Sequence, residues 1–266
     1  MMLDKSMVKN ESLMLSITEQ TLSKVPEVTL IFWIIKILAT TLGETGGDAV
    51  SMSMNLGYLV GTVIFAAIFL FAVVAQIKAK KFHPFLYWTT IVATTTVGTT
   101  LADYADRSLG IGYKGGSTLL LTLLLASLAV WYKTLGSVSI DTVSSPNVEM
   151  FYWVTIMFSQ TLGTALGDWT ADTAGLGYDG GAIIFSALLL GVLAAHFWTK
   201  ISKTLLFLAA FILTRPLGAV VGDFLDKPIA KGGLDLSRYS ASAAVILIII
   251  VCILFFPQRA GKSTGH

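Results

Sequence analysis

A fourfold repeat constrains this chain more than any other feature of its sequence. In each copy, an apolar stretch ends in a glycine that an aspartate follows five residues later. The four glycines are Gly43, Gly98, Gly163 and Gly218, and the four aspartates are Asp48, Asp103, Asp168 and Asp223. A carboxylate near lipid is costly, so ordinary packing does not explain why it recurs at a constant offset.

The composition is that of a polytopic membrane protein. Of the 266 residues, 55% are hydrophobic and 13% are charged, whereas a soluble domain carries about 25% charged residues. Apolar stretches long enough to span a bilayer, which takes about 20 helical residues, occur near 28–47, 57–77, 84–102, 115–132, 150–167, 181–198, 204–222 and 240–256. Continuous runs of this length exclude the alternating strands of a barrel. We therefore predict an all-α integral membrane protein with eight transmembrane helices.

The basic residues predict the orientation of these helices. An even number of spans places both termini on one side, and that side holds eleven of the eighteen lysines and arginines, against five on the other. The positive-inside rule then assigns residues 1–27 and 258–266 as cytoplasmic tails. The expected location is a plasma membrane, with the four motif aspartates near its outer face.

The motif spacing predicts internal symmetry. Successive motif glycines are 55, 65 and 55 residues apart, so copies one and three, like copies two and four, are 120 residues apart. This indicates a two-helix unit duplicated twice, with halves at 28–135 and 150–257 joined by a linker at 136–149. Each unit crosses the membrane twice, so the four repeats are parallel and the halves are related by a pseudo-twofold axis along the membrane normal. Parallel copies can bring four equivalent groups together around one axis.

The acids of each copy form the candidate site. Residues three or four apart on a helix are neighbours, and the resulting acid pairs are Glu44 with Asp48, Asp103 with Asp106, Asp168 with Asp172, and Asp223 with Asp226. In copies two and four, Arg107 and Lys227 stand four residues after the motif aspartate, which favours a local salt bridge. Copies one and three have Met52 and Asp172 there, and thus no local base. The first candidates for cation or metal binding are therefore Glu44, Asp48, Asp168 and Asp172, followed by Asp103 and Asp223.

Other polar residues in the apolar stretches are candidates for a supporting role. Hydroxyl oxygens that could serve as neutral ligands or proton relays belong to Thr41, Thr96, Thr161 and Thr164. Lys36 and Arg215 interrupt two apolar stretches, and a base in a membrane is expected to have a functional role or a structural ion pair. Arg215 precedes Asp223 by about two turns, so its partner is expected on another helix.

The repeated pattern T-[LV]-G-x-x-x-[GA]-D, followed in three copies by a glycine-rich turn with Gly57-Tyr58, Gly112-Tyr113 or Gly177-Tyr178, resembles a known family. It is similar to bacterial membrane-anchored proteins built from a repeat of unknown function. The resemblance covers about residues 28–256 and implies an integral bacterial membrane protein. The fourth copy departs from the pattern because it has Arg215-Pro216 before its glycine and lacks the Gly-Tyr pair.

Two functions are compatible with these features. Carboxylate and hydroxyl oxygens suit a hard cation such as Mn²⁺, Mg²⁺ or Ca²⁺, so the first is a transmembrane transporter for a small inorganic cation, with proton exchange at the carboxylates. The second is a membrane scaffold or sensor partner whose motifs serve helix packing. An aspartate-dependent intramembrane enzyme is disfavoured by the context of the motif. No cofactor and no nucleic-acid partner are expected, and the lipid bilayer is the surrounding medium.

Overall fold

The computed structural model describes residues 22–138 and 145–262, and in these ranges it contains eight α-helices. They are α2 (Leu30–Asp48), α3 (Gly57–Lys78), α4 (Pro84–Asp103), α5 (Gly112–Leu135), α6 (Pro146–Asp168), α7 (Gly177–Trp198), α8 (Lys203–Asp226) and α9 (Arg238–Phe255). Each coincides with one of the eight apolar stretches, so the prediction of an all-helical fold is confirmed. Most of the expected N-terminal tail, the middle of the linker and the end of the C-terminal tail lie outside the described residues.

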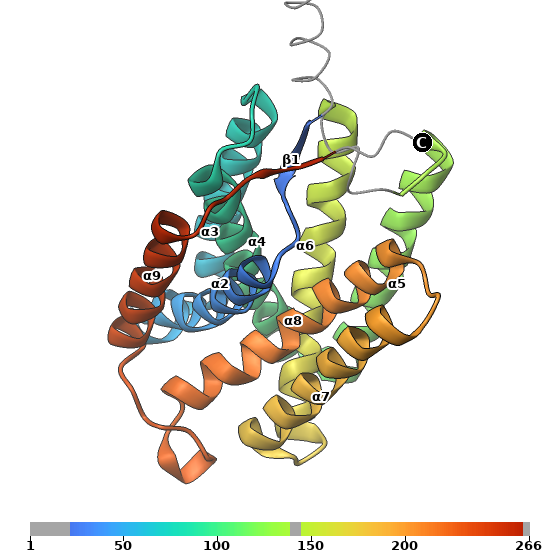
Figure 1. The fold of residues 1–266 in the computed structure, drawn as a ribbon. Coiled ribbons are helices and arrows are strands. Elements are labelled where there is room, and N and C mark those ends of the chain that lie inside the picture. Colours follow the sequence, from blue (N-terminus) through green and yellow to red (C-terminus); the bar gives the residue numbers. More distant parts are fainter. Residues whose placement is uncertain (1–21, 139–144, 263–266) are drawn as a thin grey trace, which may run out of the picture.

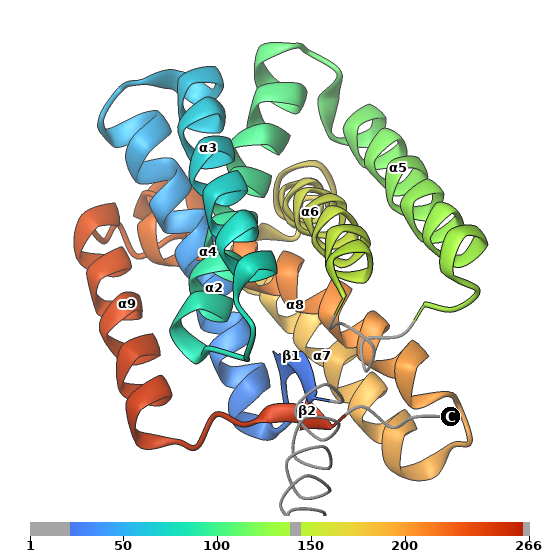
Figure 2. The ribbon, with the colours of Figure 1, turned by 90° about the horizontal axis from the view of Figure 1, so that it is seen from above.

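The helices form two concentric groups (Figures 1 and 2). The four motif helices α2, α4, α6 and α8 make an inner ring, in which each helix packs against the next and α8 closes on α2. Each outer helix covers one inner helix: α3 lies on α4, α5 on α6, α7 on α8, and α9 on α2. Every outer helix therefore leaves its own repeat and packs on the motif helix of the following repeat, which ties the four repeats into one closed assembly.

The composition of each helix matches its place. Six of the helices in the described ranges are long and apolar enough to cross a membrane, and α4 and α6 are not among them. Seven threonines make α4 more polar, and α6 buries Glu149 and Gln160; both helices are enclosed in the inner ring. The outer helices expose large apolar side chains such as Phe71, Phe197 and Leu247. Apolar surface of this extent is consistent with a membrane protein.

The motif glycines allow the inner helices to approach closely. A Cβ atom at Gly43 would lie 2.1 Å from Thr95 Oγ1, and one at Gly218 would lie 2.0 Å from Thr40 Oγ1. The other two motif glycines also face the next helix of the ring. Gly98 lies against Gln160 and Thr161, and Gly163 lies against Arg215. Each glycine thus receives the side chain or backbone of the next helix in the ring, as small residues do at membrane helix interfaces.

Equivalent positions of the four repeats form layers across the inner ring. An aromatic layer lies toward the N-terminal ends of the helices and contains the buried side chains of Phe32, Tyr87, Tyr152 and Phe207. The hydroxyl groups of Tyr87 and Tyr152 form a buried hydrogen bond of 2.9 Å. This layer closes the ring at the end opposite the motif aspartates.

We expect Tyr87→Phe to lower the free energy of unfolding by about 1–2 kcal/mol, because it leaves the buried Tyr152 hydroxyl without its partner. The double variant Tyr87→Phe/Tyr152→Phe should recover most of this loss, since no polar group is then left unpaired. Unfolding in detergent, followed by circular dichroism, measures both. Equal losses in the single and double variants would contradict the pairing.

Local backbone geometry changes where each motif ends. In the first three repeats the helix continues into a π-helical turn directly after the aspartate, at Ala49–Ser53, Tyr104–Ser108 and Trp169–Thr173. Positive φ angles follow at Gly57, Gly112 and Gly177, which glycine adopts without strain. In the fourth repeat Pro228 follows Lys227, and a proline disfavours helical geometry in the residue before it, so α8 ends at Asp226 without a π-turn.

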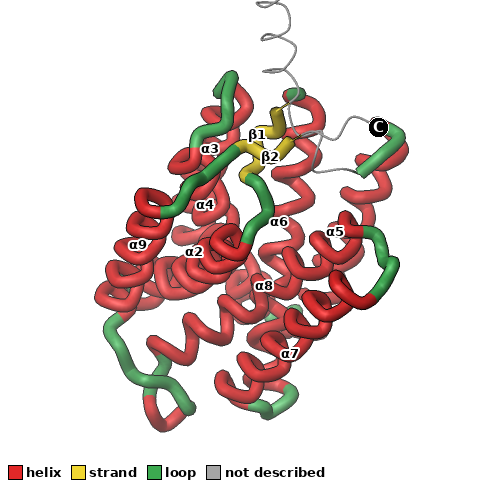
Figure 3. The backbone as a smooth tube through the Cα atoms, in the orientation of Figure 1, coloured by secondary structure: helices red, strands yellow, loops and turns green. Residues whose placement is uncertain are grey.

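A small sheet was not expected from the sequence. Strand β1 (Leu22–Pro26) pairs antiparallel with β2 (Ala260–Lys262), at the end of the bundle opposite the α8–α9 connection (Figure 3). Val25 joins the hydrophobic core, and Lys24 forms a salt bridge with Glu149 on α6. Residues 22–26, predicted to belong to a cytoplasmic tail, are thus part of the folded body.

Candidate cation site

The four motif aspartates converge at one end of the inner ring. Each occupies the last turn of its helix, and none is more than 3% exposed. Salt bridges with a shared base connect Asp103 to Asp168 and Asp48 to Asp223, and the Asp168 carboxylate is close enough to those of Asp103 and Asp223 to interact with them electrostatically. The parallel repeats therefore bring equivalent groups together, as the symmetry of the sequence suggested.

Two bases bridge neighbouring motifs. Arg107 Nε lies 3.0 Å from Asp103 Oδ1 in its own repeat, and its Nη2 lies 3.4 Å from Asp168 Oδ2 in the next. Lys227 Nζ lies 2.9 Å from Asp223 Oδ1 in its own repeat and also contacts Asp48 Oδ2 across the ring closure. The two local salt bridges expected from the sequence are confirmed.

Copies one and three lack a local base, as expected, but a base from another repeat reaches each of them in three dimensions. Asp48 and Asp168 have no base four residues later in the chain, but each is reached by the base of the preceding repeat in the ring. This follows from the ring geometry, because a basic side chain one helical turn after an aspartate also reaches the aspartate at the end of the adjacent helix.

Lys227 and Arg238 cover the cluster from the α8–α9 connection. Burial disfavours the charged form of Lys227, but the carboxylates of Asp223, Asp48 and Asp226 outweigh it and raise the pKa of this lysine above its usual value. Arg238 Nε lies 2.7 Å from Asp226 Oδ2 and 3.7 Å from Asp48 Oδ2. Lys227 is therefore a charged ammonium group that lies between carboxylates.

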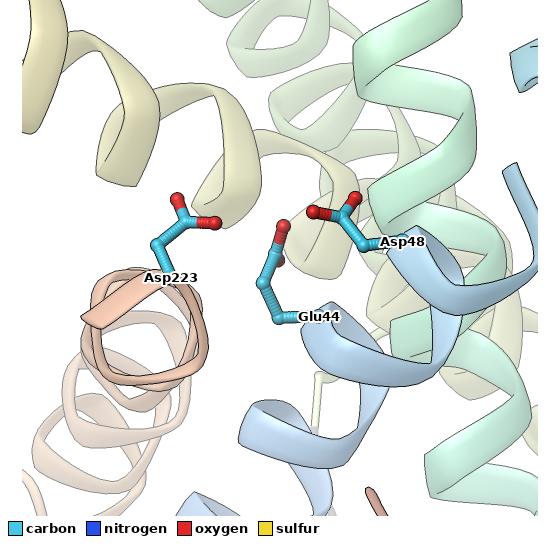
Figure 4. A group of neighbouring side chains, drawn as sticks. All are labelled: Glu44, Asp48 and Asp223. Atoms are coloured by element: carbon cyan, nitrogen blue, oxygen red, sulfur yellow. The ribbon is translucent and has the colours of Figure 1, made fainter. Parts of the chain in front are cut away.

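Three of the carboxylates are close enough to share an ion. Oxygen atoms of Glu44, Asp48 and Asp223 lie within 4.8 Å of one another, and all three residues are buried. Figure 4 shows the side chains extending toward one another from α2 and α8. Among the described residues, Asp48 Oδ1 is buried and has no hydrogen-bond partner. Oxygen ligands in this arrangement are those that hard divalent cations prefer.

The predicted Asp168/Asp172 pair is arranged differently. Asp168 belongs to the converging cluster and pairs with Arg107. Asp172 lies in the π-turn after α6, is exposed, and accepts a hydrogen bond of 3.2 Å from Tyr113 Oη. The wider π-turn separates Asp172 from the face that carries Asp168. The structure groups Asp223, and not Asp172, with Glu44 and Asp48.

Arg215 lies one layer below the carboxylates and is fully buried. Its Nη2 lies 3.1 Å from Glu44 Oε2 and donates to Thr99 Oγ1 and Thr164 Oγ1, while Nη1 donates to the Thr40 carbonyl oxygen at 3.1 Å. One side chain from α8 thus contacts the three other inner helices. Its partner lies on another helix, as the sequence indicated.

The remaining supporting candidates have different surroundings. Thr96 and Thr161 donate to carbonyl groups of their own helices, and Thr41 Oγ1 has no hydrogen-bond partner in the described part of the chain. Lys36 is fully buried, with its ammonium 4.1 Å from the centre of the Phe211 ring. Of the six supporting candidates predicted from the sequence, Thr164 and Arg215 are in contact with the carboxylate network.

Sequence reasoning missed Thr99, Arg238 and the bridging roles of Arg107 and Lys227. Thr99 is equivalent to Glu44 through the 55-residue offset of the first two copies, and it donates to Glu44 Oε2 at 3.2 Å. Aligning the copies by this offset places Thr99 at the position of Glu44 and would have found it.

The charges of the network do not cancel. It contains six buried carboxylates, which belong to Glu44, Asp48, Asp103, Asp168, Asp223 and Asp226, and four bases, which are Arg107, Arg215, Lys227 and Arg238. With every group ionised, the network carries two negative charges. A divalent cation or two protons would balance them, because like charges so close together favour a bound cation or protonation.

The fold and site define a class: an eight-helix protein made of four two-helix repeats, with a buried carboxylate cluster where the inner helices end. A family model described as Repeat of Unknown Function (DUF347) matches residues 31–82, 86–136, 151–202 and 206–260, and the chain belongs to this family. Each matched segment contains one inner helix and the outer helix that follows it. No curated protein and no solved structure is significantly similar to the chain.

Proposed function

We propose that this protein is a transporter for a small hard cation, such as Mn²⁺ or Mg²⁺, in a bacterial plasma membrane. In this proposal all eight helices cross the membrane, both termini are cytoplasmic, and the carboxylate cluster faces the outer side. The observation that carries the proposal is the convergence of the four repeated aspartates, Glu44 and Asp226 into one buried network that holds two more carboxylates than bases. A network that served packing alone would not need this excess.

Burial on either side of the network supports alternating access. Toward the outer end it is covered by basic side chains, of which Arg107 is 31% exposed and Arg238 is 21% exposed. Toward the other end the ring is filled by Arg215, by Lys36 with the Phe211 ring, and by the aromatic layer. Movement of the basic side chains opens a path to the carboxylates from outside, whereas a path inward requires the inner helices to separate. Carboxylates bind protons as well as cations, so proton exchange is the expected coupling.

The test is Mn²⁺ flux into liposomes that contain the purified protein and a Mn²⁺-quenched fluorophore. We expect Asp48→Asn and Asp223→Asn each to reduce flux to the level of protein-free liposomes, because each removes an oxygen charge from the three-carboxylate group. The matched control is Asp179→Asn, at an exposed acid in the first turn of α7, which should retain wild-type flux. An imposed proton gradient should change the wild-type rate.

The alternative is a scaffold or sensor partner, and one observation favours it: each motif aspartate already has a basic partner within the protein. In that case the aspartate variants would change stability only. Wild-type flux equal to that of protein-free liposomes, for Mn²⁺ and Mg²⁺ alike, would reject the transporter.

A further inference from the structure

We propose that Lys227 is a tethered competitor of the transported cation: its ammonium group occupies the space between Asp48 and Asp223, and an incoming divalent cation must displace it. This inference rests on the proposed transport function and assigns a specificity-determining role within the same site.

The contacts of Lys227 support this role. Its Nζ contacts Asp48 Oδ2, lies 2.9 Å from Asp223 Oδ1 and lies 3.8 Å from Asp226 Oδ1. Asp48 and Asp223 are also two of the three members of the group that could hold a cation. The ammonium and a cation bound by that group would therefore use the same carboxylates.

The local backbone allows the ammonium to leave while the helices stay in place. The Lys227 amide donates to the Asp223 carbonyl at 2.8 Å, and the Lys227 carbonyl accepts from the Asp235 amide at 2.9 Å. The main chain is thus held on both sides of the residue, whereas the lysine side chain has a flexible four-carbon stem. Rotation of this stem is enough to move the charge away from the carboxylates.

The pseudo-twofold axis provides an internal comparison. The residue 120 positions before Lys227 is Arg107, which bridges Asp103 and Asp168 in the same way. The residue 120 positions after Glu44 is Thr164, so this second half lacks the third carboxylate. An arginine holds carboxylates with several donors in a fixed geometry, and a lysine holds them as a point charge. The asymmetry places the exchangeable position at Lys227, with Arg107 as the permanent counter-ion of the other half.

A tethered charge also sets the valence that the site accepts. The three grouped carboxylates carry three negative charges when ionised. Arg215 balances Glu44, so two negative charges remain once Lys227 has left. A monovalent ion gains little by replacing an ammonium of equal charge that is already linked to the protein. A divalent ion gains more from the same carboxylates, because the Coulomb energy scales with its charge.

The experiment measures Mn²⁺ binding to the full-length protein in detergent, from the electron paramagnetic resonance signal of free Mn²⁺. We expect Lys227→Met to bind Mn²⁺ about tenfold more tightly than the wild type, because the competing charge is gone. Lys227→Arg should bind about tenfold more weakly, because a guanidinium holds both carboxylates more firmly. Lys231→Met, at an exposed lysine in the same connection, should bind like the wild type.

If Lys227 competes with the cation, Lys227→Met and Lys227→Arg shift the Mn²⁺ affinity in opposite directions. If Lys227 has a structural role only, both variants weaken Mn²⁺ binding. Equal or weaker binding in Lys227→Met overturns the competitor role. If that variant does not purify as a monodisperse protein, Lys227→Arg decides, and wild-type affinity there overturns the role as well. Failure of the wild type to show Mn²⁺ binding that Asp48→Asn abolishes would overturn the proposed cation site together with this inference. Wild-type binding without the predicted shifts would overturn the inference alone.

Discussion

Replacement of Arg215 by methionine should lower the free energy of unfolding by about 3–5 kcal/mol, the usual cost of leaving one member of a buried ion pair alone. Arg215 is fully buried, and its guanidinium lies 3.1 Å from Glu44 Oε2. Without it, Glu44 would face the carboxylates of Asp48 and Asp223 with no neutralising charge. Thr99 and Thr164 would also lose a charged hydrogen-bond partner. Chemical unfolding in detergent, followed by circular dichroism, measures the loss.

The double variant Arg215→Met/Glu44→Gln separates the ion pair from the space that the arginine fills. If the unpaired charge causes the loss, the double variant should be more stable than Arg215→Met, because no carboxylate is then isolated. A single variant within about 1 kcal/mol of the wild type would show that Glu44 accepts a proton at little cost, since one pKa unit corresponds to about 1.4 kcal/mol. That result would contradict the role assigned to Arg215 as the counter-ion of Glu44.

Much of this fold can be predicted, because the apolar stretches and the repeated motif are each visible within a short segment of the sequence. Apolar stretches of sufficient length predict eight helices, and the constant Gly-to-Asp offset predicts that the aspartates end equivalent parallel helices. The two local salt bridges follow from i,i+4 spacing. Hydropathy was less informative for α4 and α6, because the threonines of α4 and the buried Glu149 and Gln160 of α6 leave these helices less apolar than the six that are apolar enough to span a membrane.

The pairing between repeats could not be predicted by the same reasoning. Which base reaches Asp48 depends on α8 closing the ring against α2, a contact between residues 179 positions apart. The exposure of Asp172 depends on a π-turn, whose rotation per residue differs from that of an α-helix and which no residue pattern marked. Strand β1 is held by its pairing with β2, by Val25 in the core and by the Lys24–Glu149 contact. None of these contacts can be predicted from a tail that mixes charged and apolar residues.

The ring closure itself can be tested at the glycine that permits it. We expect Gly218→Val to destabilise the protein by about 3 kcal/mol, at the upper end of the usual cost of overpacking. A Cβ atom at position 218 would lie 2.0 Å from Thr40 Oγ1 and 2.9 Å from the Thr40 carbonyl carbon. The side chain can rotate away, but the backbone of α2 cannot, so α8 and α2 must separate. The same unfolding measurement in detergent applies.

The matched control is Gly191→Val in the interior of α7, where an added Cβ meets no heavy atom within 4 Å. Valine and glycine have low and similar helix propensities, so this change should alter stability by less than about 1 kcal/mol. Separation of α8 from α2 would also move Asp223 away from Glu44 and Asp48, so Gly218→Val should weaken Mn²⁺ binding while Gly191→Val leaves it unchanged. Equal stability in the two variants would mean that α2 and α8 do not meet as closely as the structure places them, and the closed ring of four repeats would then be wrong.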